Sequence, residues 1–166
     1  MNVITTQPLH HSTGPRRVVI YKARRLLELW EDGSLLVSLP VALGWQPVGH
    51  KRREGDGRTP EGHYHACVRN ANSKYHLAIG LDYPNRQDAD AGLAENAISR
   101  EQHDRIIAAL EAGGRPPWDT ALGGEIMIHG GGAGCDWTAG CVALENGSVE
   151  YLWERVPIGT DVFILP

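Results

Sequence analysis

Short stretches of alternating apolar and polar residues recur along most of the chain, which is the pattern of half-buried β-strands. β-branched and aromatic residues gather in these stretches, and glycine, proline, asparagine or aspartate separates them. We predict strands over residues 16–22, 24–31, 34–45 with a bend after Pro40, 62–68, 74–81, 125–129, 142–144 and 161–165. Asp32-Gly33 stands between two of these strands and is a strong hairpin signal.

Two segments carry helical periodicity instead. In residues 96–112, Ser99 and Gln102 fit a capping box, and an apolar stripe follows them. In residues 148–155 and the position after them, apolar side chains fall at i, i+3, i+4 and i+7. We interpret residues 82–87 as a turn and residues 46–61 as a solvated polar loop. The alternative is that the basic side chains of this loop, Lys51, Arg52, Arg53 and Arg58, contact an anionic polymer or a substrate carboxylate. This order predicts a mainly β fold, a sandwich or barrel-like sheet with two short helices at its margin.

Length and composition narrow the class of protein. A chain of 166 residues suggests one domain, which we place at residues 16–166 after a flexible lead-in of residues 1–15. Apolar residues make up 42% and charged residues 22% of the chain, as in an ordinary globular protein. The net charge of −4 gives no electrostatic case for nucleic-acid binding, and no segment approaches the ~18 apolar residues of a membrane-spanning helix.

One stretch, residues 125–144, carries the candidate chemistry. His129 and Cys141 stand at the ends of two short strands, and a loop containing Gly130, Gly131, Gly132 and Gly134 joins them. Glycine permits close backbone approach, so the loop can bring the two side chains together. A neighbouring imidazole favours the reactive thiolate. The alternative is that Cys141 is a buried structural cysteine.

This stretch resembles the signature of the YkuD-type L,D-transpeptidases, a His-Gly pair followed by [Ser/Thr]-x-Gly-Cys. Here those motifs are His129-Gly130 and Thr138-Ala139-Gly140-Cys141. Further similarity lies in GDGRTPEGHY, in RNANSKYHLAIGLDYPN and in VEYLWERVPIGTDVFI, so that it covers about residues 16–165. The resemblance implies a β-sandwich L,D-transpeptidase catalytic domain, in agreement with the mainly β pattern.

The resemblance also implies a mechanism. Cys141 would attack the carbonyl of an L-centre in a peptidoglycan stem peptide, and the acyl-thioester would pass to an amine. His129 would be the base, held by the carbonyl of Gly130, and the backbone N–H groups of Gly140 and Cys141 would stabilise the oxyanion. No metal or organic cofactor is implied, and carbapenems are expected acylating agents. If water is the acceptor, the same site is an L,D-carboxypeptidase.

The residues that contact substrate are less well indicated. Ala139 and Ala143 stand where many members of the family have a histidine and an arginine or asparagine. The candidates for substrate contact are Thr138, Trp137, His76, Tyr75 and Arg69. We expect His76, Tyr75 or Arg69 to replace the absent side chains. Thr138 matches the Ser/Thr position of the family and is expected to support the loop, and Trp137 is expected to pack in the fold or to form a wall of the acyl-donor groove.

Two other classes of function stay open at this point. One is a non-catalytic cell-wall-binding module that keeps the fold. The other is a zinc hydrolase using His129, Cys135 and Asp136, with His63 or His65. His63 and His65 share one face of a strand, but such pairs are more often two exposed imidazoles, so we expect no metal. A disulfide between Cys135 and Cys141 would disable the thiol, and we expect none.

Location and assembly are expectations as well. The resemblance implies a periplasmic or cell-envelope protein, and we expect a monomer. The first fifteen residues, MNVITTQPLHHSTGP, have neither the basic region nor the apolar run of a signal peptide, so a cytoplasmic location stays open.

Overall fold

The computed structural model describes residues 4–5 and 15–166. The lead-in predicted for residues 1–15 lies outside the described residues, apart from Ile4–Thr5 and Pro15. In chain order the elements are β1 (Ile4–Thr5), β2 (Arg16–Tyr21), β3 (Leu26–Glu31), β4 (Ser34–Pro40), β5 (Gly62–Ser73), β6 (His76–Leu81), α1 (Arg86–Ala94), α2 (Arg100–Glu111), β7 (Met127–His129), β8 (Val142–Ala143), α3 (Asn146–Trp153) and β9 (Asp161–Leu165).

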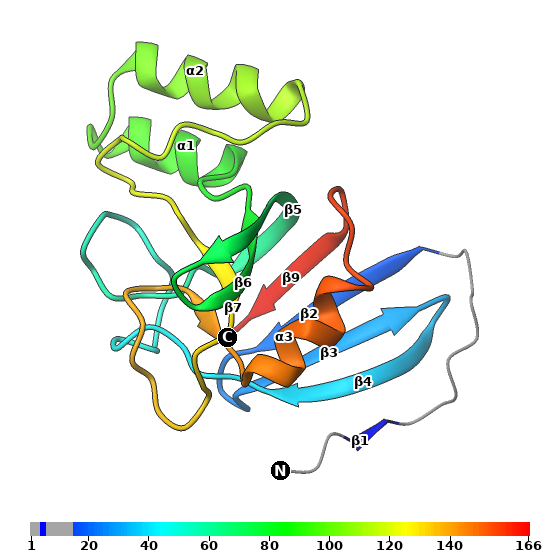
Figure 1. Ribbon diagram of the computed structural model, residues 1–166. Coiled ribbons are helices and arrows are strands. Elements are labelled where there is room, and N and C mark those ends of the chain that lie inside the picture. Colours follow the sequence, from blue (N-terminus) through cyan, green and yellow to red (C-terminus); the bar gives the residue numbers. More distant parts are fainter. Residues whose placement is uncertain (1–3, 6–14) are drawn as a thin grey trace.

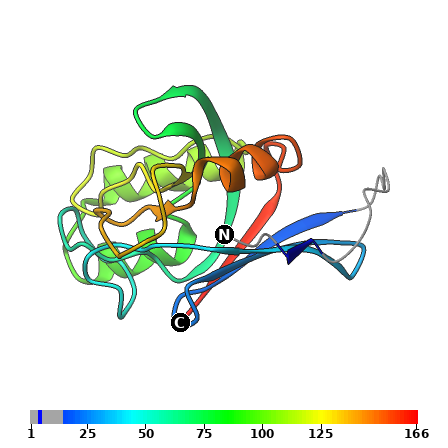
Figure 2. The same ribbon diagram turned by 60° about the horizontal axis from the view of Figure 1, so that its bottom comes forward.

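The strands form one strongly curled sheet in the order β1-β4-β3-β2-β9-β5-β6-β7-β8 (Figures 1 and 2). Strand β5 joins its two halves, because residues 62–65 pair with β9 and the remainder of the strand pairs with β6. Most neighbours are antiparallel, while β2 with β9 and β7 with β8 are parallel. The predicted mainly β fold is confirmed.

A hairpin and a continuous apolar core define the larger half of the sheet. Asp32 and Gly33 have φ angles of 48° and 76°, the double positive φ of a tight turn that matches the twist of paired strands, here β3 and β4. Leu152 of α3 and Val156 just after the helix belong to the same buried core as the inward side chains of β2, β3 and β9, and Val149 of α3 is fully buried as well. This packing fixes α3 against the sheet (Figure 1).

The expectation of two helices is wrong, because α1 begins within the segment that we interpreted as a turn. Asn85 caps α1, and its side chain accepts a hydrogen bond from the backbone N–H of Asp88, whose carboxylate in turn accepts from the backbone N–H of Asn85. The helix buries only Asp88, Ala89 and Gly92, so it has almost no apolar stripe to reveal it. Among the described residues, α3 begins at Asn146, two residues earlier than predicted.

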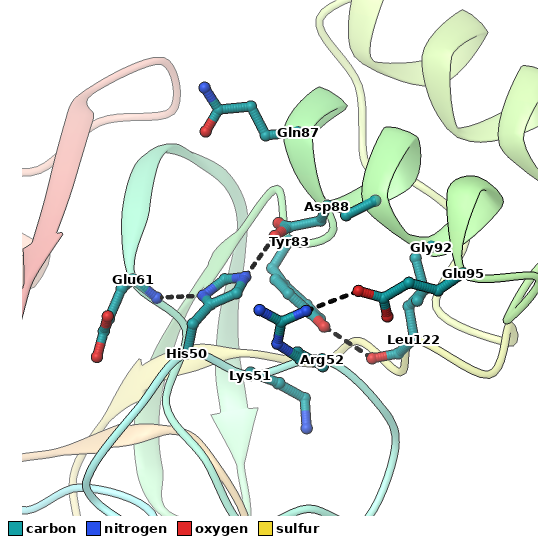
Figure 3. Close-up of a pocket in the computed structure, with 11 residues that line it drawn as sticks. His50, Lys51, Arg52, Glu61, Tyr83, Gln87, Asp88, Gly92, Glu95 and Leu122 are labelled. Carbon is teal, nitrogen blue, oxygen red and sulfur yellow. Dashed lines mark hydrogen bonds and ion pairs between the residues drawn. The ribbon is translucent and has the colours of Figure 1, made fainter.

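Helices α1 and α2 form a pair at one end of the molecule (Figure 1). Ile106 of α2 and Ala89 of α1 share a small apolar cluster with Ile98 and Leu122, separate from the core under the sheet. A cavity of about 200 Å³ lies between α1 and the segment that follows β4, with His50, Tyr83 and Gly92 among its lining residues (Figure 3). The helix pair therefore packs on the domain through a polar boundary.

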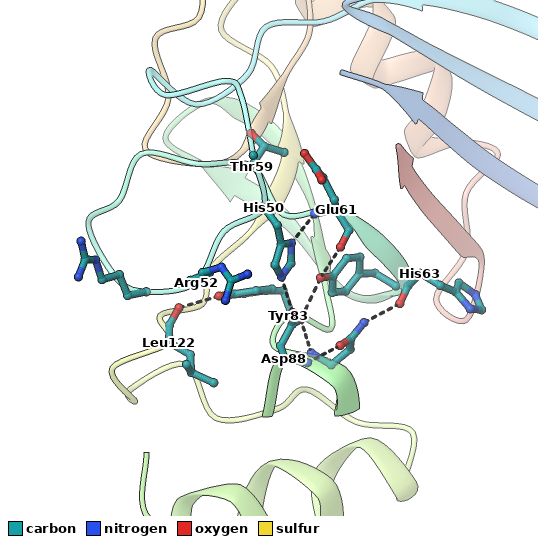
Figure 4. A network of polar contacts seen from close by, with 12 residues as sticks. His50, Arg52, Thr59, Glu61, His63, Tyr83, Asp88 and Leu122 are labelled. Atoms are coloured by element: carbon teal, nitrogen blue, oxygen red, sulfur yellow. Dashed lines mark hydrogen bonds and ion pairs between the residues drawn. The ribbon is translucent and has the colours of Figure 1, made fainter. Parts of the chain in front are cut away.

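The buried carboxylate of Asp88 binds side chains on both sides of that boundary (Figure 4). The backbone N–H of Glu61 donates to Nδ1 of His50, so the His50 proton lies on Nε2 and is donated to Asp88 Oδ1 over 2.7 Å. The hydroxyl of Tyr64 donates to the other carboxylate oxygen over 2.9 Å, and burial raises the pKa of Tyr64. One side chain thus links α1, β5 and the loop of residues 46–61.

The loop of residues 46–61 is held from the other side by Lys22. Its buried ammonium group donates to the carbonyls of Gly49 and Thr59 and to the carboxylate of Glu61, over 2.7 to 2.9 Å. The loop is therefore fixed at several points, so its backbone can hold the residues packed against it in place. No helix among the described residues is long and apolar enough to cross a membrane.

Candidate active site

Strands β7 and β8 bring His129 and Cys141 to the same side of the sheet. Ile128 pairs with Val142 and His129 with Ala143, so Cys141, which directly precedes β8, lies level with Met127. Side chains two residues apart along a strand share a face. The offset corresponds to roughly 8 Å between the α-carbons of His129 and Cys141, a spacing that side chains leaning towards each other can close.

The imidazole of His129 is held in one tautomer. Its Nδ1 lies 2.6 Å from the carbonyl oxygen of Gly130, which can only accept, so Nδ1 carries the proton and Nε2 keeps its lone pair. The residue is buried, and burial lowers the pKa of His129, although the bond to Gly130 acts in the opposite direction. At neutral pH the ring is therefore uncharged, and Nε2 is able to take a proton.

Aromatic side chains fix the plane of that ring. Tyr75 stacks on His129 with 4.6 Å between ring centroids, and Trp137 meets it edge-on at 5.6 Å. Trp137 is itself held, because its indole N–H donates to the carbonyl of Gly132 over 3.0 Å. Tyr75 and Trp137, both expected to contact substrate, thus lie beside the imidazole.

The sulfur of Cys141 is held between two backbone groups of the preceding strand. The thiol donates to the carbonyl of Glu125 over 3.2 Å, and the N–H of Met127 donates to the sulfur over 3.4 Å. Burial raises the pKa of the Cys141 thiol to about 11, and the Met127 N–H offsets only part of this effect. The resting residue is a protonated thiol rather than a thiolate.

We expected the Cys141 sulfur and the His129 ring to lie within, or close to, hydrogen-bond reach of each other, with looser geometry when no substrate is bound. Among the described residues, the hydrogen bonds of the Cys141 sulfur go to Glu125 and Met127, and none joins it to His129. To point at Nε2 of His129, the thiol proton would have to turn away from the Glu125 carbonyl by rotation about the Cβ–Sγ bond.

The turn before Cys141 requires both Gly140 and Thr138. Gly140 has a φ angle of +148°, and a Cβ at this position would lie 2.7 Å from the carbonyl oxygen of Arg58. The buried hydroxyl of Thr138 donates to the carbonyl of Cys141 over 2.7 Å and accepts from the N–H of Gly140 over 3.1 Å. Thr138 thus shapes the turn from within and has little surface to offer a substrate.

These contacts change the expected oxyanion site. The N–H of Gly140 is engaged by Thr138, so it is not free to stabilise an oxyanion as it stands. The N–H of Cys141 has no hydrogen-bond partner among the described residues, so it is free to donate to an added group. Of the two expected donors, one is therefore free and the other is engaged.

The loop of residues 46–61 forms a wall of the site, and our interpretation of it as wholly solvated is wrong. Lys51 is buried and donates to Asp56 and to the carbonyl of Arg53, each over 2.9 Å. Its positive charge lowers the pKa of Cys141, against the larger effect of burial. Periodicity did not reveal Lys51, because the segment has no regular secondary structure; the GDGRTPEGHY block was the available signal.

Arg69 and His76 are directed elsewhere. The guanidinium of Arg69 lies 4.0 Å from the ring centroid of Trp153, and it donates to the carbonyl of that residue. His76 Nε2 lies 2.6 Å from a carboxylate oxygen of Glu150. Both side chains are thus engaged with α3, whereas the backbone carbonyl of Tyr75 accepts from the N–H of Gly130 next to the imidazole.

The residues of the hypothetical zinc hydrolase are not brought together. Asp136 is paired with Arg25 at 2.8 Å and accepts the N–H of Leu43, so it supports the fold of the glycine-rich loop. Cys67, Cys135 and Cys141 are all free thiols, as expected for the Cys135–Cys141 pair. Within residues 4–5 and 15–166, metal-ligand atoms converge in one group, which contains neither His129 nor Cys135.

Comparison with known proteins identifies the family of this chain. A family model described as the L,D-transpeptidase catalytic domain, YkuD, matches residues 15–164. The chain is similar to YafK of Escherichia coli (strain K12), a protein assigned provisionally to the L,D-transpeptidases. The two are 27% identical over an alignment of 159 residues, which covers 92% of this chain and 51% of YafK. The chain spans about half the length of the curated relatives that it matches.

Solved structures show the same fold. The helical cell shape determining protein Pgp2 from Campylobacter jejuni aligns with a TM-score of 0.63 and 24% identity, over 90% of this chain and 47% of Pgp2. L,D-transpeptidase 1 of Mycobacterium tuberculosis aligns with a TM-score of 0.53 and 13% identity, over 92% of this chain and 62% of that chain. A structure of LdtMt1 in complex with imipenem aligns with a TM-score of 0.52 and 13% identity, over 90% of this chain and 58% of that chain.

Proposed function

This chain belongs to the YkuD family of L,D-transpeptidase catalytic domains, and from that premise we propose that it is a cysteine acyltransferase acting on peptidoglycan stem peptides. The observation that carries the proposal is the His129–Gly130 hydrogen bond, which leaves Nε2 unprotonated on the same side of the sheet as the Cys141 thiol. A buried cysteine with a purely structural role requires no such base beside it.

The first half-reaction begins with proton transfer. Nε2 of His129 takes the Cys141 proton as the sulfur attacks the carbonyl of the L-centre, because the thiol is protonated at rest. The oxyanion accepts the N–H of Cys141, and the N–H of Gly140 can join it if Thr138 releases that group. The carbon–nitrogen bond then breaks, and the imidazolium returns the proton to the leaving amine.

In the second half-reaction an acceptor attacks the thioester. An amine gives up its proton to His129 as it attacks, and the thiol recovers a proton as the sulfur leaves. An amine acceptor makes the protein a transpeptidase, and water makes it an L,D-carboxypeptidase. The alternative without catalysis is a module that binds the cell wall and keeps the fold.

A hollow beside the cysteine turn holds arginines that fit an anionic substrate. It has a volume of about 630 Å³, and its lining includes Arg52, Arg53 and Arg58 together with the carboxylates of Glu54, Asp56 and Glu95. Arg52 is paired with Glu95 and Asp56 with Lys51, whereas the side chains of Arg53 and Arg58 make no ion pair among the described residues. The carbonyl of Arg58 lies against Gly140, so the hollow begins next to the proposed nucleophile. We propose that a stem-peptide carboxylate binds here. Arg58→Gln should raise KM several-fold and change kcat little, whereas Arg86→Gln, on α1, should change neither; an unaltered KM in Arg58→Gln would exclude this contact.

The activity is tested by incubating the protein with a purified tetrapeptide muropeptide and weighing the products. A transpeptidase produces cross-linked dimers or amine-exchanged monomers, and a carboxypeptidase produces shortened monomers. Unchanged muropeptides with wild-type protein, under conditions in which it is folded and reduced, would leave the binding module as the better account.

The cellular location and the choice of chemical probes follow from the same proposal. A stem-peptide substrate places the protein in the periplasm or cell envelope, and LdtMt1, the relative that binds imipenem, makes carbapenems reasonable probes of the thiol. Because the chain corresponds to about half of its curated relatives, the acceptor and the partners of the whole protein are proposals too.

A further inference from the structure

A second cluster of reactive side chains lies on the outer face of β5 and β9. His63 and His65 are two residues apart on β5, and His65 is directly opposite Asp161 of β9. Asp161 Oδ1 lies 2.7 Å from His63 Nε2 and 3.3 Å from His65 Nε2. One possible ligand atom from each residue lies within 4.8 Å of the other two. The three side chains are about half exposed, so solvent ions can reach them.

Asp82 prepares one of these histidines for a metal ion. Its carboxylate accepts the backbone N–H of His65 over 2.6 Å and lies 2.9 Å from Nδ1 of the same residue. A carboxylate accepts from an imidazole N–H, so Asp82 holds a proton on Nδ1. This leaves Nε2, which lies 3.3 Å from Asp161 Oδ1, as the nitrogen that can bind a metal ion. Carboxylates that orient metal-binding histidines through the second nitrogen are a regular part of such sites.

We propose that His63 Nε2, His65 Nε2 and Asp161 Oδ1 bind a divalent transition-metal ion, zinc in the first place. Zinc binds histidine nitrogen and carboxylate oxygen at about 2.0–2.2 Å in a tetrahedron, which sets its ligand atoms about 3.4 Å apart. The observed separations of 2.7 and 3.3 Å need only small adjustments. Three protein ligands leave one position for water or an external ligand.

The sheet makes this arrangement firm. His63 and His65 come from one strand, and their partner Asp161 comes from the adjacent strand, in a register that continues over four residue pairs. The ring of His63 stacks on Phe163, with 4.4 Å between centroids and an interplanar angle of 11°. Ordinary histidine–carboxylate pairs elsewhere lack these features: His103 contacts Asp90 and Asp104, but no second imidazole lies in that group.

The metal site is independent of the proposed acyl transfer. His129 and Cys141 belong to β7 and the start of β8, at the end of the sheet, whereas His63, His65 and Asp161 belong to the central strands β5 and β9. A bound ion would join these two strands and, through Asp82, the end of β6. It would therefore stabilise the junction between the two halves of the curled sheet.

The test is metal titration of the reduced protein of residues 1–166. Calorimetry with zinc should give one site per chain, and zinc at about 100 times Kd should raise Tm by roughly 5–10 °C. His63→Ala and His65→Ala should each weaken binding at least tenfold, and Asp82→Asn about 10–100-fold. His103→Gln, the matched control, should bind as the wild type does. Circular dichroism shows whether each variant is folded.

Cobalt(II) identifies the ligand atoms, because thiolate ligands add a sulfur-to-metal charge-transfer band that nitrogen and oxygen ligands do not. We expect visible cobalt bands without charge transfer, and we expect them to disappear in His63→Ala. A thiolate band that persists in His63→Ala would place the metal at the cysteines and overturn the proposal. The proposal would also be overturned if folded His63→Ala and His65→Ala bound zinc as tightly as the wild type does.

Discussion

At the scale of single residues, burial has opposite effects on the two groups of the proposed catalytic pair. It lowers the pKa of His129 and raises the pKa of Cys141 to about 11, so both are neutral at rest. A preformed thiolate–imidazolium pair is therefore not the resting state. Proton transfer has to accompany attack, which makes the unprotonated Nε2 of His129 essential in the proposed mechanism.

The pH dependence of His129→Ala follows from these shifts. Without the base, acylation relies on the thiolate fraction, which for a pKa of about 11 is roughly 10⁻⁴ at pH 7. The variant should acylate about 10²–10⁴-fold more slowly at pH 7 and gain about tenfold per pH unit up to pH 10. Stopped-flow acylation by a carbapenem measures both values. Near-wild-type rates and an unchanged pH profile would assign the base to another residue.

In the wild type, the pH dependence of kcat/KM should reflect the protonation of His129. The pKa of His129 is lowered, so the neutral ring persists below pH 6.5 and the acidic limb of kcat/KM should lie below that value. The same shift affects folding: as pH falls below 6.5, an unfolded chain takes up the proton first, and stability decreases until the lowered pKa is passed.

At the scale of elements, the turn of residues 138–141 decides where the nucleophile points. Thr138 closes it through two hydrogen bonds, and Gly140 allows the backbone to pass the carbonyl of Arg58. Such a turn is recognisable in the sequence as a Thr-x-Gly-Cys motif. The loop that carries Arg58 is recognisable only through its GDGRTPEGHY block. Its conformation is not predictable from local preference, because tertiary contacts fix it.

We expect Gly140→Ala to be strongly disruptive. Its φ angle of +148° is costly for alanine, and the new Cβ would lie 2.7 Å from a backbone oxygen. Together these effects should lower the free energy of unfolding by roughly 1–3 kcal/mol and abolish acylation. Gly134→Ala is the control, because a Cβ there meets nothing within 4 Å, and it should stay within ~0.5 kcal/mol of the wild type. Equal urea denaturation curves for the two variants would refute this role for Gly140.

Prediction from sequence succeeded where short-range patterns carry the structure. The hairpin at Asp32-Gly33 and the capping box of Ser99 and Gln102 were both anticipated, since each depends on residues close in the chain. Helix α1 was missed because its buried residues are polar or small, as Asp88 illustrates. The convergence of His65 and Asp161 was also beyond reach, because β5–β9 pairing joins residues far apart in sequence.

At the scale of the whole molecule, the α1–α2 pair is attached to the curled sheet mainly by polar contacts. Asp88 holds His50 and the hydroxyl of Tyr64, while the apolar cluster between the helices is small. The same loop that carries His50 continues to Lys51 and Arg58 beside the proposed nucleophile. Attachment of the helix pair and shape of the site are therefore linked through residues 46–61.

Asp88→Ala tests this attachment. The change leaves the buried hydroxyl of Tyr64 with only the carbonyl of Glu61, 3.5 Å away, as an acceptor. It also removes the Asp88 half of the capping box of α1, so it should cost roughly 2–4 kcal/mol of unfolding free energy. Hydrogen exchange should also accelerate in residues 86–94. Glu101→Gln, an exposed carboxylate in the first turn of α2, should change little. If both variants unfold at the same urea concentration, the Asp88 contacts do not hold the helix pair.

The most direct measurement is the intact mass of the protein after incubation with imipenem, for the wild type and for the three single cysteine-to-alanine variants. If Cys141 is the nucleophile, one covalent adduct forms on the wild type, on Cys67→Ala and on Cys135→Ala, and none forms on Cys141→Ala at any pH. An adduct that persists on folded Cys141→Ala, or a folded and reduced wild type that acquires none, would contradict the assignment of Cys141.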